Sequence, residues 1–429
     1  MWRKRITTSR NYLKFFGPAW LVMMADMDAS STIGAIETGM TYGYKLVWFL
    51  LLLIIPLFLI QEVSGRIGVA TKKGLGEVIR ENYDRKIALL LTLPMFLTDM
   101  ATYTIEYLGA ALGLAILGIP PLIGVFIIFL VHILILIKRE YIFTERMLLG
   151  VSLVMIIGFA LTLLKRGIVN EPLFYFSPTP QYIFFLSANA GAVIMPFMLF
   201  FQASATAEKM ISVNIEKKKA IKLMRIETLI GGIVTELLMV IVEMASTGLD
   251  EPSIYSPKSF ENAFSLIAGP LSPYIFSIGL VSSAFLALVV ISLGSAWGTA
   301  EALSIPRNRI FMLYLFESIP ALVTTILTPA PQLGNEILNL LSYFTLIVLG
   351  PAIVMGLIAR NKRIMGEYTN NRWNNVAYWL SVIIISTLGI LSLLRFPPKF
   401  RSESIRYYTS SPLLYFDSLT FSIFNEFLI

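Results

Sequence analysis

The sequence predicts an all-α integral membrane protein with about eleven transmembrane helices, two of them broken in mid-membrane. The 429-residue chain is 56% hydrophobic and 14% charged, and its mean hydropathy is +0.75. Soluble domains contain about 25% charged residues, so this composition excludes both an ordinary soluble enzyme and a disordered chain. The apolar residues also fall into runs of the roughly 20 residues that a helix needs to cross a bilayer, and basic residues gather between alternate runs.

Eleven runs are long and apolar enough to span the membrane. The predicted spans are residues 16–40, 46–70, 87–117, 120–138, 147–165, 180–208, 220–246, 271–302, 309–329, 335–359 and 375–395. Residues 1–15 form a basic N-terminal segment with no small-residue cleavage site after it, so the first span is predicted to be a retained helix rather than a signal peptide. Residues 16–360 would form a core of ten spans. Residues 396–429 are too polar to span again and are predicted to form an extracellular tail.

The basic residues predict the orientation, because cytoplasmic loops carry the excess of Lys and Arg. With the N-terminus in the cytoplasm, the cytoplasmic segments hold 26 of the 34 basic residues and the outer segments hold eight. The predicted location is therefore a cell membrane, with a cytoplasmic N-terminus and an extracellular C-terminus. The net charge of +7 reflects this asymmetry, and no nucleic-acid partner is expected.

Spans 1 and 6 are predicted to be broken. Span 1 carries Asp26 and Asp28 at mid-membrane, followed by a small polar run with poor helix propensity. In span 6, Pro196 removes a helix hydrogen bond and Gly191 loosens the same stretch. Irregular backbone at this depth is tolerated where it lines a cavity.

The two breaks stand at matching positions. Spans 1 and 6 begin two five-span halves, residues 16–165 and 180–360, and these halves have opposite orientations because five is odd. Broken helices at corresponding positions of inverted halves indicate the binding site of a transporter. The backbone carbonyls of such a break can coordinate a cation.

Asp28 is the first candidate ligand for that cation. A charge at the bilayer centre costs about 2.5–3.5 kcal/mol on insertion scales, and no Lys or Arg stands at mid-span to pair with it. Asp26 could share the site or its vestibule if the backbone is unwound there. Met195 adjoins the break in span 6; its thioether would favour transition metals, although ordinary core packing is the alternative.

Span 3 carries Asp99 and Glu106, seven residues apart on one helix face. They could form a proton relay, or they could make structural hydrogen bonds. His132, the one histidine, has apolar neighbours and is predicted to be a packing residue. With no cysteine and one histidine, the chain can form no disulfide, thiolate zinc site or multi-histidine metal site. No cofactor is expected, and the sequence contains no nucleotide-binding motif. Transport is therefore expected to use an ion gradient as its energy source, or no energy source at all.

These motifs resemble the Nramp family of divalent metal-ion transporters, from about Gly17 to Arg360. The matching stretches are Gly17-Pro18-Ala19, Gln61-Glu62, Arg66-Ile67-Gly68, Ala70-Thr71, Thr98-Asp99, Gly191-Ala192, Met195-Pro196 and the segment from Ser282-Ser283 to Glu301. The resemblance implies a LeuT-type fold of two inverted five-helix repeats, with a divalent metal ion as the transported substrate.

The resemblance also implies the remaining site residues. The family's Asp-Pro-Gly-Asn motif corresponds to residues 28–31, so Ser31 stands in place of the asparagine ligand. The Met-Pro-His-Asn motif corresponds to residues 195–198, in which the methionine is kept and the histidine is replaced. Ala192 would supply a carbonyl ligand. A second family histidine falls at Gln202, so proton coupling is expected to be weak or absent.

The leading hypothesis is therefore a secondary transporter that imports Mn²⁺- or Fe²⁺-like divalent cations by alternating access. A Mg²⁺ transporter of the Nramp-related type is one alternative, because altered span-1 motifs and acid pairs such as Asp26 and Asp28 resemble that branch. A carrier of amino-acid-like organic substrates on the same fold is another. An enzyme is not expected, because the sequence contains no cysteine, no histidine pair and no Gly-x-Ser-x-Gly motif. The sequence does not indicate an oligomeric state; the bilayer and the metal ion are the expected partners.

Overall fold

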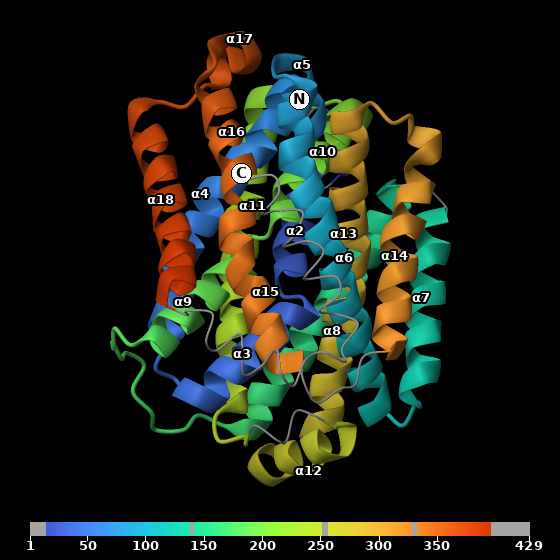
Figure 1. Cartoon of the computed structure of the whole chain (residues 1–429), viewed down its shortest axis with the longest axis vertical. Helices are drawn as coiled ribbons and strands as arrows, with labels where there is room; N and C mark the ends of the chain where they lie inside the picture. The colour runs from blue at the N-terminus through green and yellow to red at the C-terminus, as the bar shows by residue number, and fades with distance from the viewer. Residues whose placement is uncertain (1–13, 138–140, 251–255, 328–332, 396–429) are drawn as a thin grey trace, which may run out of the picture.

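The computed structural model describes residues 14–137, 141–250, 256–327 and 333–395, and in these ranges all regular structure is helical (Figure 1). Nine of the described segments are long and apolar enough to cross a membrane. The membrane-length elements and the halves of broken ones are α2 (Pro18–Asp26), α3 (Ala29–Tyr42), α4 (Val47–Thr71), α6 (Arg85–Ile116), α7 (Pro121–Ile137), α8 (Tyr141–Arg166), α9 (Pro180–Val193), α10 (Pro196–Ser212), α11 (Lys217–Ser246), α13 (Ser272–Leu303), α14 (Ile310–Leu327), α15 (Leu333–Ile347), α16 (Leu349–Arg360) and α18 (Arg372–Arg395).

Each of the eleven predicted spans coincides with one helix or with two consecutive helices. The largest difference at an edge is in α8, which begins at Tyr141 rather than at residue 147. The span predicted at 335–359 is divided at Val348 into α15 and α16. The predicted tail, residues 396–429, and most of the N-terminal segment lie outside the described residues. The division into repeats at 16–165 and 180–360 stays a prediction.

Three short helices were not predicted: α5 (Leu75–Asn82), α12 (Pro257–Ala268) and α17 (Lys362–Met365). They are too short and too polar to register as spans. In α5, for example, Leu75, Val78 and Ile79 are buried while the opposite face is charged. Figure 1 shows α5 and α17 at one end of the bundle and α12 at the other.

Both predicted breaks are confirmed. Helix α2 ends at Asp26, and α3 begins at Ala29 with Asp28 as its extended N-cap residue. Helix α9 ends at Val193, and α10 begins at Pro196, which occupies the first turn, where its missing N–H costs no helix hydrogen bond. The local sequence therefore stops and restarts each helix.

Helix α11 runs alongside the whole broken helix formed by α2 and α3. Its Glu227 accepts hydrogen bonds from the Gly17 and Trp20 N–H groups, both at 2.8 Å. A Cβ on Gly231 would stand 2.8 Å from Met23, and one on Gly39 would stand 2.2 Å from the Glu243 carbonyl oxygen. The part of α11 between residues 231 and 243 therefore lies level with the break.

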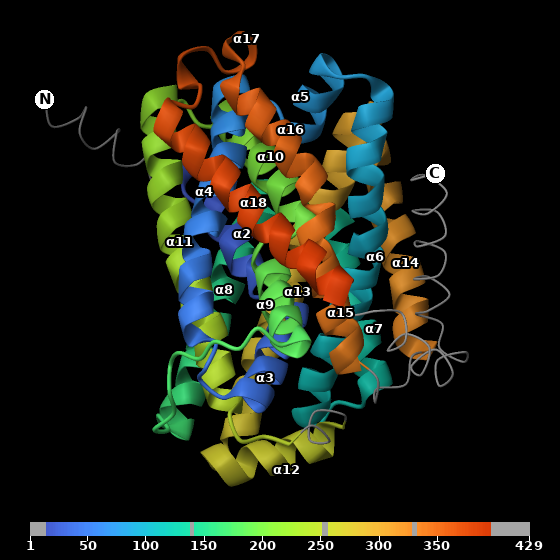
Figure 2. The same ribbon diagram turned by 60° about the vertical axis from the view of Figure 1, so that its left-hand side comes forward.

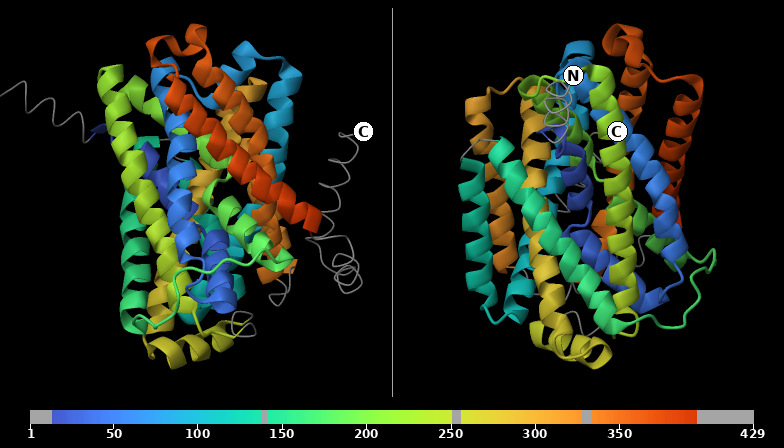
Figure 3. Two further views of the ribbon diagram at one scale, coloured as in Figure 1. Left: turned by 90° about the vertical axis from the view of Figure 1, so that its left-hand side faces the viewer. Right: turned by 180° about the vertical axis from the view of Figure 1, so that it is seen from behind.

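The first half of the second broken helix, α9, packs closely against α15. A Cβ on Gly191 would stand 1.6 Å from the Leu341 carbonyl oxygen, so only glycine permits α9 and α15 to lie this close. Helix α18 runs across the outside of the bundle and contacts α9 and α15 (Figure 2). Viewed from behind, α8 and α11 cover the other side of α2 (Figure 3). The two breaks are thus enclosed in the centre of the bundle.

Candidate metal centre

Asp28 is held in position because it is the N-cap residue of α3. Its Oδ1 accepts hydrogen bonds from the Ser31 N–H at 2.6 Å and the Ser30 hydroxyl at 2.8 Å, as an N-cap residue does. Its Oδ2 has no hydrogen-bond partner in the described part of the chain, and the side chain is fully buried. One carboxylate oxygen is therefore fixed by the start of α3, and the other is left for a cation or for the neighbouring Glu106 carboxyl group.

Ser31 connects the first break to the second. Its hydroxyl lies 3.4 Å from the Ala192 carbonyl oxygen, to which it donates. Ala192 is in the last turn of α9, where carbonyl groups have no donor within the helix. Three residues predicted as ligands, Asp28, Ser31 and Ala192, are therefore joined by a short series of hydrogen bonds.

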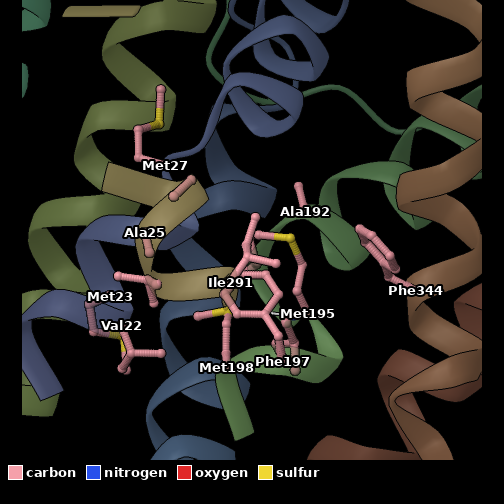
Figure 4. Packing of buried hydrophobic residues seen from close by; sticks show 14 of the residues in the cluster. Val22, Met23, Ala25, Met27, Ala192, Met195, Phe197, Met198, Ile291 and Phe344 are labelled. Atoms are coloured by element: carbon pink, nitrogen blue, oxygen red, sulfur yellow. Dashed lines mark hydrogen bonds between the residues drawn. The ribbon is translucent and has the colours of Figure 1, made fainter. Parts of the chain in front are cut away.

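Met195 follows three residues after Ala192, at the N-cap position of α10. Its N–H donates to the Met198 sulfur at 3.4 Å, and its side chain is fully buried. Figure 4 shows Met195 packed in one apolar cluster with Phe197, Met198 and Ile291. The structure thus places a second thioether, Met198, beside the predicted one. The sequence interpretation treated position 198 only as a departure from the family motif.

Glu106 lies at the break itself. Its carboxylate oxygens accept hydrogen bonds from the Ala29 N–H at 2.9 Å and the Ser30 N–H at 3.2 Å, and it interacts electrostatically with Asp28. A carboxylate at a helix N-terminus is stabilised by the free N–H groups and by the helix dipole. Glu106 therefore holds the first turn of α3 in place next to the predicted metal ligand.

Asp99, seven residues earlier on α6, lies among different neighbours. It is fully buried near Ser295 of α13 and Glu317 of α14, and neither of its carboxylate oxygens makes a hydrogen bond to a described residue. Glu317 accepts hydrogen bonds from Ser295 and from Tyr103, the latter at 3.3 Å. The two predicted relay residues therefore lie in two separate polar clusters.

Asp26 stands on the other side of the break from Ser31. It ends α2, is fully buried, and interacts electrostatically with Glu236 of α11 and then with Asp28. No hydrogen bond to either of its carboxylate oxygens is found within the described ranges. The structure therefore brings it close to α11 rather than into the hydrogen-bonded series that reaches Ala192.

His132 is a packing residue, as predicted. It is fully buried, and its ring nitrogens lie 2.9 Å from the Tyr107 hydroxyl and 2.8 Å from the Ser292 hydroxyl.

The sequence analysis did not identify Glu317 as a site residue, although it is a single acid within an otherwise apolar span, which is a recognisable signal.

The donor set at the break is mixed. No group of three or more His, Cys, Asp or Glu side chains in the described residues could hold a metal ion, so a metal here would need other donors. Asp28 offers a carboxylate oxygen, Ala192 a carbonyl and Met195 a thioether. Carboxylate and carbonyl oxygens suit ions such as Mn²⁺, and the sulfur favours softer transition metals.

No buried base competes for Asp28. Among the described residues, the buried Lys and Arg side chains are those of Arg66 and Lys209. Arg66 pairs with Glu62 at 2.9 Å, and Lys209 pairs with Glu145 at 2.6 Å. The negative charge at the break is therefore not balanced by a nearby Lys or Arg.

The family model described as natural resistance-associated macrophage protein-like, or Nramp, matches residues 19–395. The divalent metal cation transporter MntH of Bacillus subtilis (strain 168) is 29% identical over 408 residues, which cover 90% of this chain and 93% of that protein. MntH of Staphylococcus haemolyticus is 27% identical over 414 residues, covering 89% and 92%.

The solved structures give the same fold. A crystal structure of the Eremococcus coleocola manganese transporter, bound to an aromatic bis-isothiourea compound, superimposes with a TM-score of 0.77 at 19% sequence identity. The match covers 96% of this chain and 92% of that one. The LeuT-type helical fold expected from the sequence is confirmed by this likeness.

Proposed function

Because this chain belongs to the Nramp family, we propose that it is a secondary transporter that imports divalent metal cations of the Mn²⁺ and Fe²⁺ type across a cell membrane. The observation that carries this proposal is the geometry of the breaks. A buried carboxylate with one free oxygen is linked through Ser31 to a carbonyl of the second break, and no base neutralises it. The names of its MntH relatives support the same substrate class.

The substrate would be held by donors from both broken helices. Asp28 would supply its free oxygen, Ser31 its hydroxyl oxygen, Ala192 its carbonyl and Met195 its sulfur. Glu106 places a second carboxyl group next to Asp28. A dipositive cation that enters this site would be attracted by the Asp28 carboxylate, and the sulfur would favour Mn²⁺ and Fe²⁺ over Mg²⁺.

Alternating access requires that each side can close, and contacts that would close both sides are present. The start of α2 is held by Glu227, which accepts from two of its N–H groups, and by Lys209, which donates to the Lys14 carbonyl at 2.7 Å. On the other side, α9 is packed against α15 at Gly191. We propose that release of the α2 contacts opens the cytoplasmic path and that separation of α9 from α15 opens the outer one.

The proposed orientation places the α5–α17 end of the bundle in the cytoplasm. The basic excess supports it, because α4, α10 and α16 approach that end with Lys72, Lys209 and Arg360. The N-terminus would then be cytoplasmic and the C-terminus extracellular.

We propose weak or absent proton coupling. The two positions at which the resemblance implies histidine hold Phe197 and Gln202, and the Gln202 amide donates to Thr228 at 3.1 Å. His132 is already hydrogen-bonded on both ring nitrogens. A histidine that changes charge near neutral pH is therefore not placed at the break.

A Mg²⁺ transporter is the second candidate, favoured by the predominance of oxygen donors around Asp28. An organic-substrate carrier fits less well. Such a carrier would use the N–H groups at the start of α3 to bind a substrate carboxylate. Here those of Ala29, Ser30 and Ser31 are already taken by Glu106 and Asp28.

The function can be tested with the purified protein in proteoliposomes. Uptake of Mn²⁺ and of Mg²⁺ is measured side by side with internal metal-sensitive dyes, with Asp28→Asn as the inactive control. Saturable Mn²⁺ uptake in the wild type and none in the variant is expected. Uptake of Mg²⁺ alone would favour the second candidate, and uptake of neither ion would contradict metal transport.

A further inference from the structure

We propose that Asp26 and Glu236 form a second cation site, separate from the one assigned to Asp28, which takes a hard divalent cation, Mg²⁺ or Ca²⁺. It lies where the end of α2 meets α11. This inference goes beyond the proposed transport function, and it is tested without measuring transport.

The Asp26 and Glu236 carboxyl groups both lack partners among the described residues. The Asp26 and Glu236 side chains are each 0% exposed, and none of their four carboxylate oxygens has a hydrogen-bond partner within the part of the chain that the structure describes. The two groups are electrostatic neighbours. Buried charged groups are normally paired or bound to a metal, because leaving them alone costs several kcal/mol.

The two helix ends that meet at the break have opposite polarity. Asp28 and Glu106 stand at the start of α3, where they accept backbone N–H bonds. Asp26 and Glu236 stand at the end of α2, where a helix presents carbonyl groups without donors and a partial negative charge. The start of α3 stabilises its two acids, whereas the end of α2 repels its two acids unless a cation lies between them.

No described base is available to serve as that cation. Arg66 and Lys209, the buried Arg and Lys side chains of the described ranges, are paired with Glu62 and Glu145. The buried His132 is hydrogen-bonded to Tyr107 and Ser292. Lys209 also binds the Lys14 carbonyl, at the opposite end of α2. Any positive charge between the two acids therefore comes from solution.

The donor chemistry selects the ion. Two carboxylates and the carbonyl groups that end α2 are all oxygen donors, which Mg²⁺ and Ca²⁺ prefer. Their combined charge matches one divalent cation better than one Na⁺. Met195, the soft donor, belongs to the other broken helix. The two sites are thus predicted to differ in preference, one for hard ions and one for transition metals.

Helices α2 and α11 are in close contact beside the site. Gly231 of α11 is in close contact with Met23, one turn before Asp26, and a Cβ there would come within 2.8 Å of the methionine side chain. This contact holds Glu236 level with the end of α2. A cation bound between the two helices would fix the position at which α2 stops, and with it the geometry of the break.

The test uses full-length protein in detergent, stripped with a chelator, in an Asp28→Asn background that removes the first site. Thermal unfolding is followed during titration with Mg²⁺, Ca²⁺ and Na⁺, and bound Ca²⁺ is counted by equilibrium dialysis. We expect Mg²⁺ or Ca²⁺ to raise Tm and about one Ca²⁺ to bind per chain.

Adding either Asp26→Asn or Glu236→Gln should remove the bound Ca²⁺. Either substitution should also raise the Mg²⁺ or Ca²⁺ concentration needed for the same rise in Tm at least tenfold. The matched control is Glu243→Gln, an equally buried acid two turns further along α11 whose carboxylate oxygens also lack a described partner. It should leave both signals unchanged. The two test variants change different helices, so a folding failure in one leaves the other as the test.

Three results would overturn the proposal. The first is an Asp28→Asn protein that neither binds nor is stabilised by Mg²⁺ or Ca²⁺, which would place Asp26 in the first site or leave the pair protonated. The second is stabilisation that survives both Asp26→Asn and Glu236→Gln. The third is stabilisation by Na⁺ as strong as that by the divalent ions.

Discussion

Replacing Asp28 with asparagine separates the binding role of this residue from its structural role. Its Oδ1 accepts two hydrogen bonds, at 2.6 and 2.8 Å, that start α3. Asparagine keeps that acceptor and is as good an N-cap as aspartate, so the free energy of unfolding should change by less than about 0.5 kcal/mol. Alanine removes the acceptor and should cost about 1 kcal/mol.

Metal affinity should respond in a different way. Both substitutions remove the charged, unbonded Oδ2 from a buried site. Removing one partner of a buried charge interaction costs about 3–5 kcal/mol, and each 1.4 kcal/mol is a factor of ten in affinity. Mn²⁺ affinity should therefore fall by more than about a hundredfold in both variants.

The assay pairs two measurements on the same preparations. Thermal unfolding of the chelator-stripped protein reports the stability, and the concentration dependence of Mn²⁺ uptake in liposomes reports the affinity. The expected pattern is an Asn variant as stable as the wild type, an Ala variant of lower Tm, and no saturable uptake in either. An Asn variant that takes up Mn²⁺ with an unchanged KM would refute the reasoning.

Three further predictions follow from other parts of the structure. Met195→Ala should weaken uptake of Mn²⁺ and Cd²⁺ more than that of Mg²⁺ in competition assays, because only the former two gain from sulfur; an equal loss for all three would leave Met195 a packing residue. Mn²⁺ added outside liposomes at clamped voltage should cause little acidification of an internal pH dye; strong acidification that disappears in Asp99→Asn would show coupling through Asp99. Gly191→Ala should destabilise the protein by at least about 1–3 kcal/mol in thermal unfolding, because its Cβ would stand 1.6 Å from the Leu341 carbonyl oxygen. The control Gly150→Ala, a helical position with nothing within 4 Å, should be neutral or stabilising.

The helical architecture was largely predictable because it depends on local properties. Hydropathy located each span, and Pro196 together with the acids at 26 and 28 marked where two helices stop and restart. The short helices α5 and α12 were not predicted, because they are amphipathic rather than apolar and are too short to be recognised as transmembrane segments.

The partners of the site residues were not predictable, because they depend on how distant spans pack. Glu106 and Asp99 share one helix face, so spacing alone grouped them as a relay. In the structure Glu106 caps α3, whereas Asp99 lies near Glu317 of α14. The approach of Glu236 to Asp26 also depends on the packing of α11 beside α2, which no local pattern encodes.

The proposed function requires that a divalent metal ion binds between the two helix breaks. Anomalous X-ray diffraction from crystals soaked in Mn²⁺ tests it most directly, because it locates the metal without reference to transport. A peak is expected in contact with Asp28 Oδ2, the Ala192 carbonyl oxygen and Met195 Sδ, and it should be absent from Asp28→Asn crystals. Well-occupied Mn²⁺ elsewhere in the protein, with no peak at the breaks, would contradict it.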